Sequence, residues 1–222
     1  TDDDRVLLEA LSPRLSHLLG RTRAYLDHVR EFAALREALR TASGVRRARH
    51  DGLTAISHEV CLATARRLKL PAEDIEHLAL ALQVFDVGLS RLSEQLLRKA
   101  EPLTAGERDL VRQHVRHGLD ILAPLQFSPR VRQIILHHHE RADGTGYPDG
   151  LEGEAIPIGA RLLALADCLG AMLQGRPYRA PLPLETGLAE IESLAGSQFC
   201  PRLVGPFVAE ARRSEERRVG KE

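Results

Sequence analysis

Apolar residues recur at steps of three and four along nearly the whole chain, and no stretch alternates apolar with polar residues for long enough to build a sheet. Such steps place apolar side chains on one face of a helix, which a bundle buries against its neighbours. We therefore predict an all-α protein. Its 222 residues suffice for one well-filled core, or for a core domain with an extension.

Prolines and capping residues divide this pattern into segments. Ser-Pro pairs at 12–13 and 128–129 combine an N-cap with a proline at the first helical position, and Thr104 is a third cap. Pro71 interrupts the helix that precedes it. A turn-rich loop, RADGTGYPDGLEGEAIP, follows three consecutive histidines. The expected helices are 13–40, 46–70, 72–85, 104–122, 129–139 and 159–173, with a last pair after residue 184.

The first predicted helix carries an apolar seam that is broken only at Arg36 and consists of Leu15, Leu18, Thr22, Tyr25, Val29, Phe32 and Leu39. This spacing is typical of a coiled coil. It predicts a parallel homodimer that transmits a signal from an upstream domain; the alternative is that the seam packs on the core of its own chain. We expect residues 1–43 to form this signalling helix, 44–212 the compact domain and 213–222 an unstructured polar tail.

The composition limits the classes of partner and compartment that we expect for this chain. Lys plus Arg and Asp plus Glu number 31 each, so no overall charge favours nucleic acid. No apolar run approaches the roughly 20 residues of a membrane span, and no leader opens the chain. Cys61, Cys168 and Cys200 form no paired motif and are interpreted as buried thiols in a reducing compartment. We expect a cytoplasmic protein and, because it starts at Thr1 rather than at a methionine, a fragment of a longer one.

Several spaced motifs together resemble the HD-GYP family. The stretch HHERADGTGYPDGLEGEAIPIGARLLALAD, with RPYR and SQFCPRLV after it, carries the resemblance, which extends back through LTAGERDLVRQHVRHGLDIL and FDVGLSRLSEQLL to LKLPAEDI. It covers about residues 45 to 210. The resemblance implies an HD-type helical bundle and the hydrolysis of cyclic di-GMP at two or three metals, commonly iron or manganese.

The resemblance also implies a ligand set. The retained positions are Asp86, His114, His138, His139 and Asp167. In the family the three histidines serve one metal, which shares the aspartate at position 86 with its neighbour. One carboxylate and three imidazoles suit iron, zinc or nickel. We expect one transition metal ion, manganese included, or none.

Three positions depart from the family pattern. Phe85 stands where the His-Asp pair should begin, Leu53 where an early histidine should stand, and Leu89 where a lysine should contact phosphate. Because phenylalanine and leucine cannot bind a metal, the second metal site loses its imidazoles, and no catalytic residue is assigned.

Nearby residues offer few replacements for the lost ligands. His50 and Arg49 share a helix face with Leu53 and are the best substitutes, although a solvated position is the simpler reading. His58 is expected to point elsewhere. His117 and His137 match no family ligand and are expected to be surface or supporting residues.

The loop after the histidines implies a ligand-binding rim. Gly146, Tyr147 and Pro148 match the residues that shape the substrate rim, and Arg176 and Arg179 match basic residues that meet phosphates. The alternative is that the glycines only permit the turn and the arginines are solvated. The resulting hypothesis is a degenerate signalling module that acts through a GGDEF-type or other protein partner. The alternatives are a residual phosphodiesterase and a cyclic-dinucleotide receptor.

Overall fold

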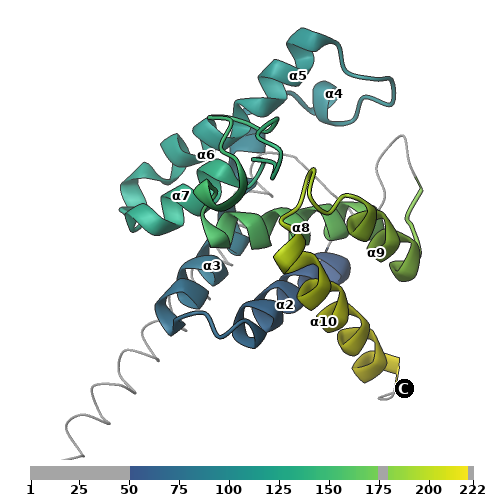
Figure 1. Cartoon of the computed structure of the whole chain (residues 1–222). Coiled ribbons are helices and arrows are strands. Elements are labelled where there is room, and N and C mark those ends of the chain that lie inside the picture. The colour runs from purple at the N-terminus through teal and green to yellow at the C-terminus, as the bar shows by residue number, and fades with distance from the viewer. Residues whose placement is uncertain (1–50, 175–179, 220–222) are drawn as a thin grey trace, which may run out of the picture.

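A computed structural model describes residues 51–174 and 180–219. This part of the chain is helical, without a named strand, which confirms the all-α prediction (Figure 1). The α-helices are α2 (Asp51–Arg67), α3 (Ala72–Val84), α4 (Glu94–Leu97), α5 (Ala105–Arg112), α6 (His114–Leu122), α7 (Pro129–His137), α8 (Ile158–Gln174), α9 (Leu184–Ser193) and α10 (Pro201–Val219), and the short 3-10 helices are η1 (Val87–Arg91), η2 (Ala123–Leu125) and η3 (Gly153–Ala155).

Several predictions fall outside the described residues. They include the N-terminal seam with its dimer, the candidate substitutes Arg49 and His50, and the rim residues Arg176 and Arg179. Leu53 lies within α2, but its side chain is not described. None of the described helices is both long and apolar enough to cross a bilayer.

Helix α8 is the centre of the bundle. It packs against α2, α3, α7, α9 and α10, and its buried positions are small or aliphatic. At Gly159 a side chain would collide with Ile134 of α7, so this glycine lets the two helices approach closely. Cys61 is buried against α8, whereas Cys168 and Cys200 are partly exposed, so only the first behaves as the predicted buried thiol.

The predicted caps begin the expected helices. Thr104 accepts the backbone N–H of Glu107, whose carboxylate accepts the N–H of Thr104, and Ser128 accepts the N–H of Val131. The single helix expected after Thr104 is broken at Gln113 into α5 and α6. The break has a packing reason: α5 buries no residue, whereas α6 buries one face that includes His114. Figure 1 shows α4 and α5 projecting from the body, with α6 lying against it.

The last helix corrects the predicted polar tail. Helix α10 continues through Arg213 to Val219, so these residues are helical rather than unstructured. Arg213 pairs with Glu210 at 2.8 Å, and Glu210 also pairs with Arg67 of α2 at 3.1 Å. Ser214 is buried on the same helix. The charged segment therefore has an inward face that its composition did not reveal.

Candidate metal centre

Three imidazoles from two helices meet at one point. His114 begins α6, and His138 and His139 directly follow α7; one ring nitrogen from each lies within 4.8 Å of the other two. The ring centres of His138 and His139 are 4.1 Å apart, and that of His114 lies 5.0 Å from His139. Three of the five predicted ligands are therefore brought together.

The backbone orients two of these rings. Nδ1 of His114 lies 2.7 Å from the carbonyl oxygen of Val111, and Nδ1 of His138 lies 2.7 Å from that of Ile135. Because a carbonyl only accepts, each Nδ1 carries the hydrogen and each Nε2 presents a lone pair. Both side chains are almost fully buried, and neither Nε2 has a hydrogen-bond partner among the described residues.

This arrangement fits a bound metal. A buried polar atom without a partner costs free energy, and a metal-ligating histidine usually fixes its other nitrogen on a carbonyl or carboxylate. Burial lowers the pKa of His138 to about 4, although the nearby Asp86 carboxylate opposes this shift. The ring is therefore neutral at pH 7, which is the form that binds a metal.

The two predicted carboxylates lie at the edge of the cluster. Oδ1 of Asp86, the residue before η1, is 3.7 Å from Nε2 of His114. Burial first, and then the charges of Asp167 and Asp86, raise the pKa of the Tyr147 phenol. Neither carboxylate belongs to the tight group of donor atoms found among the described residues.

A glycine sets the distance between Asp86 and His114. A Cβ at Gly88 would overlap the carbonyl oxygen of His114, and η1 packs closely along α6. Any larger residue would have to push η1, and Asp86 with it, away from the histidine cluster.

The other side of His138 is apolar. Phe85, which caps the C-terminus of α3, has 8% of its surface exposed, and its ring centre lies 5.1 Å from that of His138, edge to face. On α2, the ring centre of His58 lies 6.3 Å from that of Phe85. His58 thus lies beside Phe85 and outside the group of three histidine donors, and its expected direction relative to Leu53 stays a prediction. Leu89 is half-buried within η1.

The loop after α7 folds back over the cluster. The Tyr147 ring stacks on His139 with ring centres 4.9 Å apart and planes inclined by 24°. The backbone N–H of Tyr147 donates to the backbone carbonyl of His139. Buried Glu140 accepts the backbone N–H groups of Asp149 at 2.8 Å and Leu151 at 3.1 Å. A Cβ at Gly146 would overlap the backbone of Glu140, so the predicted rim glycine is required for this close turn. Pro148 follows Tyr147 through a cis peptide bond.

Comparisons with known proteins identify the family of this chain. A family model described as "HD domain" matches residues 5–203. The chain belongs to the HD-domain family. The "Cyclic di-GMP phosphodiesterase response regulator RpfG" of Xanthomonas campestris pv. campestris is 35% identical over 88% of this chain and 53% of its own length. A "Cyclic di-GMP phosphodiesterase" of Thermotoga maritima is 38% identical over 60% of this HD-domain chain and 37% of its own.

Solved structures support the same fold. The cyclic GMP-AMP specific phosphodiesterase V-cGAP3 of Vibrio cholerae superposes with a TM-score of 0.58 at 22% identity, covering 79% of this chain and 47% of that one. The HD-GYP-type protein Bd1817 of Bdellovibrio bacteriovorus gives 0.59 at 15% identity, covering 82% and 63%. The family model and the Xanthomonas and Thermotoga relatives, together with this shared fold, confirm the HD-GYP resemblance. This HD domain spans about half or less of the length of the Xanthomonas and Thermotoga relatives.

Further contacts hold the HD-domain loop in place. His137 is buried, and its Nε2 lies 3.0 Å from Oδ2 of Asp149, whose Oδ1 accepts from Arg116 at 3.1 Å. Of the two alternatives expected for His137, the surface position is therefore wrong, because the side chain is buried and contacts the loop. His117 is partly buried one turn after His114 and lies outside the cluster.

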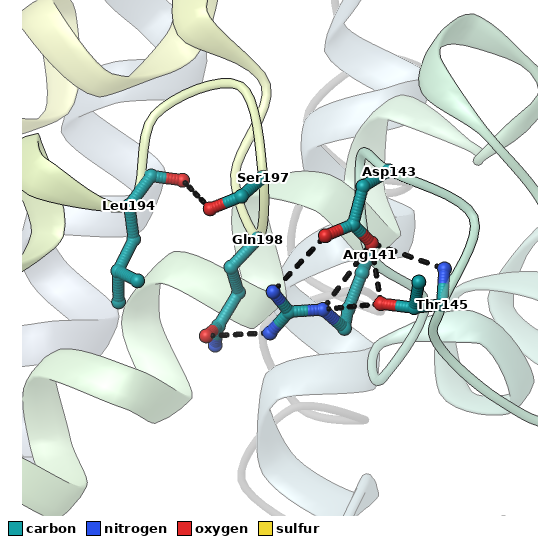
Figure 2. Close-up of polar contacts among 6 residues, drawn as sticks. All are labelled: Arg141, Asp143, Thr145, Leu194, Ser197 and Gln198. Atoms are coloured by element: carbon teal, nitrogen blue, oxygen red, sulfur yellow. Dashed lines mark hydrogen bonds and ion pairs between the residues drawn. The ribbon is translucent and has the colours of Figure 1, made fainter.

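An arginine that the sequence reasoning missed ties this loop to the α9–α10 turn. Figure 2 shows Arg141 donating to Asp143, Thr145 and Gln198, the last at 2.9 Å. The backbone N–H of Asp143 donates to the carbonyl of Ser197 at 2.9 Å. Hydrogen bonds from Thr145 and then Arg141 lower the pKa of Asp143 to about 2. The loop is thus tied to the α9–α10 turn through Arg141 and Asp143, and to α6 and α7 through Asp149.

A second residue that the sequence did not single out lies next to Tyr147, the ring that stacks on His139. The guanidinium carbon of Arg112, the last residue of α5, is 5.4 Å from the centre of the Tyr147 ring. No spacing signal marked it, because only the folded loop brings Tyr147 to it.

Proposed function

We propose that this HD domain is a degenerate HD-GYP signalling module that holds one transition metal and acts by binding a ligand or protein partner rather than by hydrolysing cyclic di-GMP. Phe85 carries the proposal. At position 85 the family pattern has a metal-binding histidine, whereas here the phenylalanine ring lies edge-on to His138. Phenylalanine has no lone pair, and an apolar ring raises the cost of placing an unpartnered dication beside it.

The proposed metal set is Asp86, His114, His138 and His139, with Asp167 at the edge. Its support is the pair of buried Nε2 atoms of His114 and His138, which have lone pairs but no hydrogen-bond partner among the described residues. A bound ion would supply Lewis-acid polarisation of a phosphate oxygen. The protein's own part is to hold the imidazoles neutral, in one tautomer and away from water.

Loss of hydrolysis follows from the incomplete donor set. Two-metal hydrolysis stabilises both the attacking and the leaving oxygen, so one missing metal removes half of that arrangement. Leu89 also lacks the charge of the family lysine, and removing one donor of this kind typically costs roughly 10²–10³ in rate.

The test is an assay of cyclic di-GMP hydrolysis with iron or manganese supplied. We expect activity to be absent or far below that of an intact relative assayed alongside. An Asp86→Ala variant purified identically measures contaminating enzyme. Turnover comparable to the relative, and abolished by Asp86→Ala, would identify a residual phosphodiesterase and overturn the degenerate reading.

A cyclic-dinucleotide receptor is the second candidate function. It is favoured by Tyr147, which lies stacked on His139 at the rim although the second half-site has lost its ligands. The relatives named above act on cyclic di-GMP or cyclic GMP-AMP by their descriptions, so both molecules are suitable probes. Saturable binding without turnover would support this function.

The proposed module divides at about residue 43. Residues 1–43 would dimerise in parallel and pass the state of the 44–212 domain to a GGDEF-type or other regulator. Light scattering on a chain that starts near Val45 tests this part. Unchanged dimerisation of the shortened chain would contradict it.

A further inference from the structure

Arg112 lies where the exposed rim meets the histidine cluster. It is the last residue of α5 and stands two positions before His114. Its guanidinium carbon is 5.4 Å from the centre of the Tyr147 ring, and that same ring stacks on His139. A guanidinium at this distance from an aromatic ring is held by a cation–π contact. Tyr147 therefore connects the positive charge of Arg112 to the candidate metal centre.

This charge can be offered to a ligand. The nearest carboxylate given for Arg112 is that of Asp109 at 3.5 Å, and the two side chains are 54% and 67% exposed. An ion pair so exposed is weak because water screens it. Arg116, four residues later, differs, because it pairs at 3.1 Å with the Asp149 carboxylate that also holds His137. Arg112 can therefore turn to an anion without releasing the loop.

The chemistry of the guanidinium selects the anion. Its planar fork of N–H donors matches two oxygens of a phosphate, which a single ammonium cannot match in the same way. A phosphodiester carries one negative charge and two non-bridging oxygens. The rim otherwise lacks a cation at position 89, where leucine replaces the family lysine.

We propose that Arg112 contacts a phosphate of a cyclic dinucleotide bound over the histidine cluster, with the Tyr147 ring holding its guanidinium in place. This inference rests on the receptor function proposed above. It assigns the phosphate contact to a residue outside the His-Asp, GYP and RPYR motifs.

Equilibrium binding of cyclic di-GMP and 3′,3′-cGAMP to the full chain tests the assignment. Losing a hydrogen bond to a charged group costs about tenfold or more in affinity, so Arg112→Ala should weaken binding by that factor and make it less sensitive to salt. Arg112→Lys restores the charge without the fork and should give an intermediate affinity. Arg108→Ala, which removes the same charge from the exposed surface one turn earlier in α5, should change affinity less than twofold.

The outcomes separate the two proposals. If the wild-type chain binds neither dinucleotide, both the receptor function and the Arg112 assignment fail. If the wild type binds and Arg112→Ala binds equally well, only the Arg112 assignment fails. Circular dichroism and metal content of each variant exclude a loss caused by unfolding. Arg112→Gln, which keeps most of the aliphatic stem, replaces the alanine variant if the latter does not fold.

Discussion

The two sides of the His138 ring differ in what the protein places there. On one side are His114 and His139, and the His114 ring is turned by a backbone carbonyl so that its Nε2 presents a lone pair. On the other side is Phe85, followed by His58 of α2. The first side has the chemistry of a metal site, whereas the second places an apolar ring against His138, with the partly exposed imidazole of His58 beyond it.

This contrast bears on how the proposed loss of ligands could be tolerated. Gly88, Gly146 and Glu140 hold the backbone around the histidines, and each acts through packing or hydrogen bonds that need no metal. None of these contacts involves position 85. Under the proposal, the fold can therefore keep the three histidines in order although Phe85 and Leu53 supply no ligand.

The largest expected effect comes from rebuilding the apolar side. The double variant Phe85→His with Leu53→His should raise cyclic di-GMP hydrolysis about 10²-fold or more over the wild type, because the second metal regains its imidazoles. Adding Leu89→Lys should increase the rate further. Neither single histidine should suffice, because the half-site would still lack one ligand. Product formation with iron or manganese present is the measurement, and high activity in either single variant would contradict the proposal.

The next effect comes from breaking the histidine side. His138→Ala should reduce bound metal from at most one ion per chain to nearly none, as measured by elemental analysis of protein purified without chelator. His117→Ala is the matched control, since His117 lies one turn after His114 on α6 but outside the cluster. The wild type should also unfold at a higher temperature with metal than without, because the ion binds only the folded state. Two fully occupied metals per chain would refute the one-metal prediction.

Local signals allowed much of the fold to be predicted. Thr104 and Ser128 mark helix starts because a cap is decided by residues three positions apart. The break at Gln113 could not be predicted in this way, because it depends on His114 turning toward the core while α5 stays exposed. The helical end of α10 was missed although Arg213 and Arg218 form local pairs with Glu210 and Glu215, three positions earlier. The contact that depends on tertiary packing is the pair of Glu210 with Arg67 of α2.

The candidate site shows the same limit. The convergence of His114 with His138 and His139 came from family resemblance, because sequence separation alone does not place α6 against α7. The contact of His58 with Phe85 could not be predicted from the spacing along α2, because Phe85 follows another helix, α3. Arg112 was missed because it meets Tyr147 only after the loop has folded back.

A smaller effect concerns pH in the metal-free protein. Burial lowers the pKa of His138 from 6.5 to about 4. Between these values the unfolded chain binds a proton that the folded chain does not, so the free energy of unfolding should fall as pH falls through this window. The full effect is about 3 kcal/mol, at roughly 1.4 kcal/mol for each pH unit. Urea unfolding from pH 7 to pH 4 measures it.

A His138→Phe variant provides the comparison, because the same fall should be smaller without this imidazole. Asp143 and Glu107 have pKa values lowered to about 2, so the stability that they contribute is lost only as pH falls below their unfolded values of 3.8 and 4.5. Glu107 thus overlaps only the lower end of the His138 window, and its contribution is the same in the wild type and the variant. Parallel pH profiles for the wild type and the variant would show that His138 does not control the slope.

The smallest expected effect tests whether the apolar side is only packing. Phe85→Leu keeps an apolar side chain at a position that is 8% exposed but removes part of the ring volume against His138. We expect it to lower the free energy of unfolding by about 1 kcal/mol, as moderate changes of core shape do, and to leave metal content unchanged. Phe85→Ala should cost about 3–5 kcal/mol, because it opens a cavity that the surrounding helices cannot close. Urea unfolding measures the change in stability of both variants, and elemental analysis measures their metal content. If Phe85→Leu loses its metal while remaining folded, the two sides of His138 are coupled, and the phenylalanine ring must be holding that imidazole in its ligating orientation.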